Sequence, residues 1–207
     1  MEKFILDTNL FFNMDANLGL GRKTEEIVVG LTEKITILKK NKKAQFFMPP
    51  KIVSEFLSFF ENKEQDFIKS LLLQVTIKSP DISKVNLPSR VFYRLIEDVR
   101  ERSHRGLNIG EEEIESSGRL FQGLKIESTK EFQIKIGGVI KKFRERYRNA
   151  TRVGFLDSVA DLDLIMLSLE QDGYLVTTDE GVLSWGRYFG IKEMPSQLFI
   201  KHIQGLM

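Results

Sequence analysis

The chain has 207 residues, 42% of them hydrophobic, and is long enough for one globular domain with a buried core. It contains no cysteine and only two histidines, which excludes disulfides, thiol nucleophiles and thiolate zinc sites and leaves carboxylates as the source of metal ligands. No stretch approaches the roughly 18 apolar residues that span a bilayer, so we expect a cytoplasmic protein that does not contact membranes.

The net charge of +2 conceals an uneven distribution along the chain. Residues 82–152 contain 16 of the 31 Lys and Arg residues but only 10 of the 29 Asp and Glu residues, a net charge of +6 that leaves −4 for the remainder. Such a split indicates a polyanion-binding part beside an acidic part, although solvated helix faces would produce the same counts.

The N-terminal part of the chain predicts alternating strands and helices. Apolar runs at 4–6 and 45–48 predict buried strands, and the apolar spacing within 24–40 predicts a helix between them, with Thr24 as its N-cap. The further elements expected here are a helix beginning at Pro50 and extending through 60, a helix at 67–72, and a short strand or entry segment at 75–77.

The region 86–150 has helical periodicity only, and we expect three helices there, at 89–105, 109–120 and 128–150. The alternation then resumes with an apolar pair at 155–156, a helix at 158–170, a strand at 174–177, a helix at 181–189, a strand at 191–194 and a final helix.

Strands that alternate with helices predict a three-layer α/β fold, in which helices cover both faces of a parallel sheet. We expect 1–81 and 153–207 to form this core and 82–152 to form a helical insertion.

Aspartates follow the runs that predict strands. Asp7, Asp157 and Asp179 each occupy such a position, and ligand sites in open parallel sheets lie beyond the carboxyl ends of the strands. Asp161 comes four residues after Asp157, about one helical turn farther along the same face. We therefore expect four carboxylates to converge in one cleft.

Neighbouring carboxylates raise one another's pKa and oppose folding, and a divalent cation removes that conflict. A ligand set of oxygen atoms alone favours Mg²⁺ or Mn²⁺, which can activate a water molecule for phosphodiester hydrolysis. Helix capping would explain Asp157 or Asp179 taken singly, whereas their convergence favours a metal site. Glu55 and Asp163 are weaker candidates, because a solvated helix face explains the first equally well and the second is turned away from Asp161.

A basic stripe precedes the third aspartate site. Lys141, Arg144, Arg148 and Arg152 share one helix face, and guanidinium groups can hold phosphate oxygens in a bidentate manner. Contacts to phosphates recognise the shape of an RNA helix rather than its sequence. We expect RNA to bind here, the alternative being a solvated face with Glu145 as a partial partner. Apolar residues at helical spacing nearby are expected to serve packing or protomer contact: Phe132, Ile136, Val139, Ile140 and Phe143.

Several stretches of the chain resemble one family of nucleases. Residues 4–12, FILDTNLFF, resemble the opening strand and turn of PIN domains. Over nearly the whole chain the resemblance narrows to the HARPs, which are minimal protein-only ribonuclease P proteins formerly called RNA ligase partner proteins. The matching stretches are 46–50 with Glu55, 143–148, 156–158, 161–163, 178–181 with Trp185, and 190–192.

The resemblance implies a PIN-like core whose metal-binding aspartates match Asp7, Asp157, Asp161 and Asp179, with a protruding helical subdomain through which protomers pair. It also implies a homo-oligomer built from dimers, and an endonuclease that removes the 5′ leader of precursor tRNA without an RNA subunit. Two alternatives stay open. One is another PIN ribonuclease of the toxin-like kind, and the other is a noncatalytic RNA-binding partner of an RNA-processing enzyme.

Overall fold

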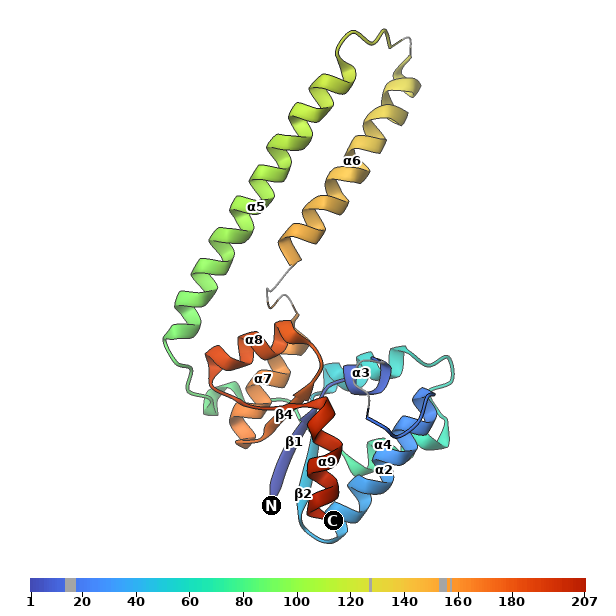
Figure 1. Cartoon of the computed structure of the whole chain (residues 1–207), viewed down its shortest axis with the longest axis vertical. Coiled ribbons are helices and arrows are strands. Elements are labelled where there is room, and N and C mark those ends of the chain that lie inside the picture. The colour runs from blue at the N-terminus through green and yellow to red at the C-terminus, as the bar shows by residue number, and fades with distance from the viewer. Residues whose placement is uncertain (14–17, 127, 153–155, 157) are drawn as a thin grey trace. The chain divides into compact units, whose positions relative to one another are not determined.

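The computed structural model describes residues 1–13, 18–126, 128–152, 156 and 158–207 (Figure 1). Contacts divide the chain into two compact units, one made of Met1–Arg90 with Leu156–Met207 and the other of Val91–Phe155. Contacts therefore assign residues 82–90, which were expected to belong to the insertion, to the first unit. None of the helices in the described part of the chain is long and apolar enough to cross a membrane.

A five-stranded parallel sheet forms the centre of the first unit, in the order β3-β2-β1-β4-β5. Phe4 of β1 pairs with Phe46 of β2 on one side and with Tyr174 of β4 on the other. The residues Phe4, Ile5 and Leu6 are fully buried, as expected for a strand whose two faces are both covered. The predicted α/β fold with a parallel sheet is confirmed. The strands are β1 (Glu2–Leu6), β2 (Ala44–Met48), β3 (Thr76–Ile77), β4 (Tyr174–Thr177) and β5 (Lys192–Pro195).

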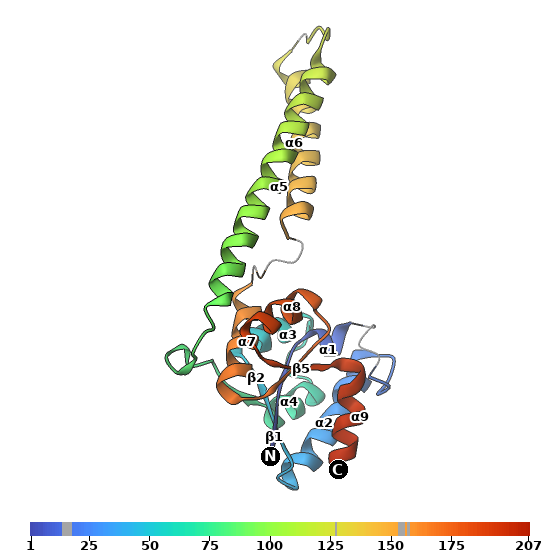
Figure 2. The ribbon, with the colours of Figure 1, turned by 60° about the vertical axis from the view of Figure 1, so that its left-hand side comes forward.

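Helices cover both faces of this sheet, as Figures 1 and 2 show. On one face α2 (Thr24–Lys40) packs against α4 (Asp66–Gln74), β2 and α9 (Ser196–Leu206). On the other face α7 (Val159–Gln171) packs against β1, β4 and α8 (Glu180–Phe189). Because the connections after β1 and after β3 lead in opposite directions along the sheet, the strand order reverses between β1 and β4.

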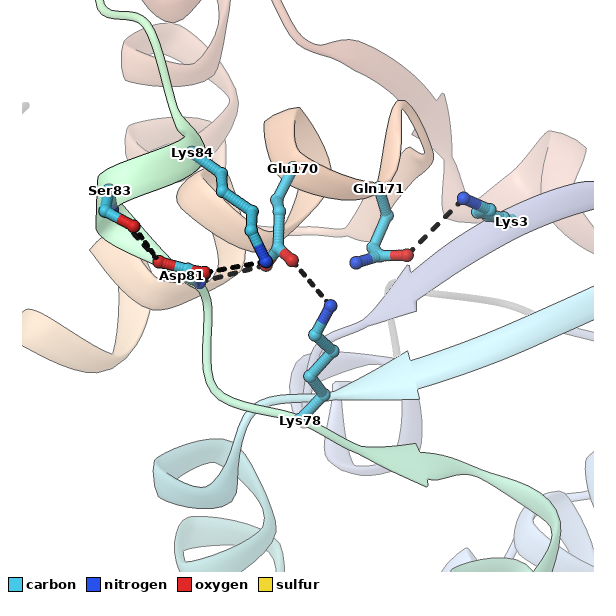
Figure 3. Close-up of polar contacts among 7 residues, drawn as sticks. All are labelled: Lys3, Lys78, Asp81, Ser83, Lys84, Glu170 and Gln171. Atoms are coloured by element: carbon cyan, nitrogen blue, oxygen red, sulfur yellow. Dashed lines mark hydrogen bonds and ion pairs between the residues drawn. The ribbon is translucent and has the colours of Figure 1, made fainter.

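Polar contacts fasten the segment that follows β3 to the end of α7 (Figure 3). The buried Glu170 carboxylate accepts from Lys78 Nζ at 2.5 Å and from the backbone N–H of Asp81 at 3.0 Å. Asp81 also forms an ion pair with Lys84 Nζ at 2.9 Å. It is the N-cap of the short 3₁₀ helix Ile82–Lys84. These bonds explain why residues 78–84 belong to the first unit.

The second unit is a pair of helices, α5 (Arg90–Phe121, whose first residue belongs to the first unit) and α6 (Thr129–Arg152). The break predicted between 105 and 109 is wrong, because α5 continues through it. Gly106 lies inside the helix, where a Cβ atom would come within 2.7 Å of the Tyr147 ring. The glycine therefore permits close packing of α6 and does not end the helix.

The apolar residues of α6 are only partly covered. Ile136, Val139, Ile140 and Phe143 line an apolar hollow together with residues of α5, and Ile140 is 41% exposed. Phe132 packs against Phe121 of α5, with ring centroids 6.0 Å apart, and is itself 44% exposed. Packing within the unit accounts for part of this stripe and leaves the rest of its apolar surface exposed.

Two further local predictions are corrected. The N-cap of α2 is Lys23 and not Thr24, which is the first helical residue. The Glu26 side chain instead accepts from the backbone N–H groups of Arg22 and Lys23, at 2.8 and 3.4 Å. Leu156 is not in a strand, and Phe155 lies outside the described residues.

Candidate active site

The reversal of strand order between β1 and β4 creates the place where an open α/β sheet binds its ligand, outside the carboxyl ends of these strands. Asp7 directly follows β1, and its backbone N–H donates to Val176 O of β4 at 3.2 Å. Asp179 lies two residues beyond the end of β4. Two predicted site residues are therefore attached to neighbouring strand ends.

The Asp7 carboxylate is buried, with 3% of the residue exposed, and is held by three side chains. Its Oδ2 accepts from Thr177 Oγ1 at 2.5 Å and from Asn9 Nδ2 at 3.1 Å, and its Oδ1 accepts from Thr8 Oγ1 at 3.3 Å. Burial raises the pKa of Asp7 above its ordinary value, and the charge of Glu55 also raises it, while the hydrogen bonds from Thr177 and Thr8 act in the opposite direction.

Glu55 is the second carboxylate at this place, and it comes from α3 (Pro50–Ser58). A short helix that the sequence pattern did not predict, α1 (Asn9–Phe12), fixes the position of α3. Phe11 of α1 packs edge-on against Phe56 with ring centroids 5.1 Å apart, and Phe12 stacks on Phe59 at 4.0 Å. These contacts pack α3 against α1, and the charge of Glu55 on α3 acts on Asp7.

Asp161 and Asp179 lie in the first turns of two helices that run back from the carboxyl edge of the sheet. Ser158 is the N-cap of α7 and accepts from the backbone N–H groups of Ala160 and Asp161, at 3.1 and 3.4 Å. Asp179 is the N-cap of α8, and its Oδ1 accepts from Gly181 N at 2.7 Å and Val182 N at 3.2 Å. The capping role considered for Asp179 is therefore present, and Ser158 caps α7 in place of Asp157.

Asp163 has a different partner from the other candidates. Its carboxylate forms an ion pair with Lys51 Nζ at 3.1 Å, which joins α7 to the first turn of α3. Asp157 lies outside the described residues, so the four-aspartate cluster is not described as a whole. Within the part of the chain that the structure describes, no three histidine or acidic residues are grouped closely enough to hold a metal ion.

The chemistry of the described donors fits a hard divalent cation. They are carboxylate oxygens, and the buried Asp7 lies beside the negative charge of Glu55, an arrangement that is unfavourable without a nearby positive charge. A cation would lower the free energy of the ionised pair. Among the candidate ligands, Asp7 and Glu55 are two described carboxylates close enough to influence each other, and Asp161 and Asp179 stay predicted ligands.

The described basic side chains in the C-terminal half of α6 fall into two groups. Lys142 and Arg146 form ion pairs with the buried Glu113 of α5, the first at 3.2 Å. Lys141, Arg144 and Arg148 are exposed and line one surface hollow, and no ion pair joins them to another described residue. Glu145 lines the same hollow without pairing with a described arginine. The side chain of Arg152 lies outside what the structure describes.

A parallel sheet with acidic side chains beyond the carboxyl ends of its central strands defines a class of α/β proteins that act on a ligand at that edge.

The family model of PINc domain ribonucleases matches residues 3–207. The RNA-free ribonuclease P of Thermococcus kodakarensis is 31% identical over 208 residues, which cover 99% of this chain and 96% of the relative. The RNA-free ribonuclease P of Pyrococcus horikoshii is 34% identical, over 93% of this chain and 86% of the relative. That of Thermodesulfovibrio yellowstonii is 31% identical, over 96% of this chain and 91% of the relative.

The chain belongs to the PINc domain ribonucleases and, among them, to the family of the RNA-free ribonuclease P proteins, the HARPs. The resemblance carried by the sequence motifs is confirmed.

Proposed function

We propose that this protein is a metal-dependent endoribonuclease that removes the 5′ leader from precursor tRNA in the cytoplasm, needs no RNA subunit, and leaves a 5′-phosphate. The observation that carries the proposal is the buried Asp7 carboxylate beside the charge of Glu55 at the switch point of the sheet. It occurs in a chain that aligns over nearly its whole length with RNA-free ribonuclease P proteins.

The metal ligands in this proposal are Asp7, Asp157, Asp161 and Asp179, with Glu55 as a further carboxylate. Oxygen ligands favour Mg²⁺ or Mn²⁺. When bound, such an ion lowers the pKa of a water molecule and stabilises the charge that develops on the leaving 3′ oxygen.

Hydrogen bonds and helix N-termini of the chain would position the metal ligand and the phosphate. Asp7 is held by the hydrogen bonds from Thr177 and Asn9, so little reorganisation is needed when a ligand arrives. The N-termini of α7 and α8 both lie at the carboxyl edge, and the positive ends of their dipoles favour a phosphate there.

Recognition of the substrate is assigned to the exposed basic stripe of α6. Lys141, Arg144 and Arg148 have no competing carboxylate partner among the described residues, and Arg152 continues their spacing. Phosphate contacts of this kind read the shape of an RNA helix, and precursor tRNAs share a shape while their leaders differ in sequence.

The second unit is also the proposed site of assembly into a homo-oligomer built from dimers. Large apolar side chains of α5 and α6 are exposed, among them Ile114 at 74% and Ile134 at 69%. An apolar surface of this kind on a pair of helices indicates a protein partner.

The decisive experiment incubates the purified full-length protein with 5′-labelled precursor tRNA and Mg²⁺ and maps the cut to the nucleotide. Asp7→Asn should lose most of the activity. The matched control is Asp172→Asn, because Asp172 is exposed, caps the opposite end of α7 in a left-handed conformation that asparagine also adopts, and precedes β4, whose other end leads to Asp179.

Each result favours one proposal. A Mg²⁺-dependent cut at the first nucleotide of the mature tRNA supports ribonuclease P activity. Cuts within mature tRNA, rRNA or mRNA would instead support a toxin-like PIN ribonuclease. RNA binding without any cut, unchanged by Asp7→Asn, would support a noncatalytic RNA-binding partner.

A further inference from the structure

Thr177 is a buried hydroxyl that touches both strand ends of the candidate metal site, and no role follows for it from the acidic motif. It is the last residue of β4 and is 1% exposed. Its Oγ1 donates to Asp7 Oδ2 at 2.5 Å and accepts from the backbone N–H of Asp179 at 3.0 Å. One hydroxyl thus joins the two candidate ligands attached to neighbouring strands.

The directions of these two bonds are fixed by the number of protons. The backbone N–H of Asp179 can only donate, so the threonine oxygen accepts there and its single proton is available to Asp7. A donor that itself accepts a hydrogen bond is polarised and binds its acceptor more strongly. The hydrogen bond from the Asp179 backbone therefore strengthens the hydrogen bond that Thr177 donates to Asp7.

The two carboxylate oxygens of Asp7 differ in how many hydrogen bonds they accept. Oδ2 accepts from both Thr177 and Asn9, which uses the two lone pairs of that oxygen. Oδ1 has the longer contact, 3.3 Å from Thr8 Oγ1, and is the oxygen with capacity for a further ligand. Loss of the Thr177 hydroxyl would release the carboxylate from this orientation.

We infer that Thr177 is a positioning residue of the metal centre, which sets the orientation of the Asp7 carboxylate and its spacing from Asp179. The inference rests on the proposed function, since it assumes that these carboxylates bind a divalent cation. Residues that orient a metal ligand commonly contribute about 10-fold to 100-fold to metal affinity. A purely structural threonine would change stability and leave that affinity unaltered.

The test measures Mn²⁺ binding to the full-length protein without RNA, by the electron paramagnetic resonance signal of the free ion. Thr177→Val keeps the shape of the side chain and removes the hydroxyl, and it should weaken Mn²⁺ binding by about 10-fold or more. Thr177→Ser should bind as the parent does. The control is Ser168→Ala, because Ser168 is also a buried hydroxyl whose bond to a described residue stays within α7, to Leu164 O at 2.8 Å, and its loss should leave binding unchanged.

If Thr177→Val does not fold, Thr177→Ser is compared with Thr177→Cys, whose S–H is a weaker donor of similar size, and the cysteine variant should bind Mn²⁺ several-fold more weakly. Equal affinities in the folded variants, with Asp7→Asn defective, would overturn the role of Thr177 and leave the proposed function standing. Equal Mn²⁺ binding by the parent and Asp7→Asn would overturn both.

Discussion

Arg146 of α6 and the buried Glu113 of α5 form an ion pair across the two helices, and Lys142 joins the same carboxylate at 3.2 Å. The side-chain hydrogen bond from Arg146 is the main cause of a lowered pKa of Glu113. These two cations are used inside the second unit, whereas the exposed Lys141, Arg144 and Arg148 form no ion pair with another described residue.

Removal of the paired cation should loosen the second unit. Arg146→Ala leaves the Glu113 carboxylate buried with less compensation, so hydrogen exchange in α5 and α6 should become faster while exchange in the sheet of the first unit is unchanged. Arg119→Ala is the control, since Arg119 pairs with Glu115 on the exposed side of α5 alone. Equal protection in the parent and Arg146→Ala would contradict a stabilising role for the pair.

Removal of the exposed cations should weaken RNA binding instead. Arg144→Ala and Arg148→Ala are each expected to raise the Kd for precursor tRNA and to make its salt dependence shallower by about one phosphate contact. Arg→Lys should restore binding only in part, because the point charge remains and the bidentate fork is lost. A salt titration of the double alanine variant checks this, and an unchanged slope would place the RNA path elsewhere.

The candidate ligands should differ in their effect on folding. Asp7→Ala, Asp157→Ala, Asp161→Ala and Asp179→Ala are each expected to reduce cleavage by on the order of a thousandfold. Asp179→Ala should in addition lower the free energy of unfolding by about 1 kcal/mol in EDTA, because Asp179 caps α8 through two backbone N–H groups. Cleavage rates and thermal unfolding in EDTA measure the two effects, and near-normal cleavage by any two variants would refute the site.

Charged substitutions on the exposed apolar surface of the second unit should break the assembly. Light scattering of the parent is expected to give a mass well above the 23.9 kDa of one chain, and Ile114→Glu combined with Ile134→Glu should lower it. Leu73→Glu is the control, because Leu73 is 78% exposed on α4 of the first unit. A parent that is monomeric at micromolar concentration would contradict the proposed dimer.

Stability should depend on pH through Glu170. Burial alone would raise the pKa of this carboxyl, but the hydrogen bonds from Lys78 and from the backbone of Asp81 outweigh it and lower the pKa below 4.5. A lowered pKa contributes stability above the unfolded value of 4.5 and loses it as the pH falls through the folded value. Glu170→Gln should therefore destabilise the protein by about 1–2 kcal/mol at pH 7 and by less near pH 3. Thermal unfolding at the two pH values measures this, with Glu61→Gln as the control, because Glu61 is exposed.

The sequence pattern was sufficient for most strands and helices because their apolar spacing is regular, as in 24–40 and 174–177. It failed at Gly106, where a glycine that usually weakens a helix is instead required by the approach of Tyr147. It also missed α1, which has only four residues and is held by aromatic contacts to residues far along the chain.

Of the candidate site residues, the sequence predicted the positions of two at strand ends. Positions after strands identified Asp7 and Asp179, because this signal is local. The approach of Glu55 to Asp7 and the bond from Thr177 depend on packing between separate elements, which spacing along the chain does not encode. The sequence does show a threonine at the end of the strand before Asp179. Its contact with Asp7 becomes apparent only once β1 is known to pair with β4.

The hydrogen bond from Thr177 to Asp7 joins residues 170 positions apart, and it has a consequence for protein synthesis. Asp7 and Glu55 leave the ribosome more than a hundred residues before β4 does. Until β4 pairs with β1, Asp7 lacks Thr177 and the turn with Asp179 is missing. The Asp7 site described above can therefore be complete only after β4 and the turn that follows it have been synthesised.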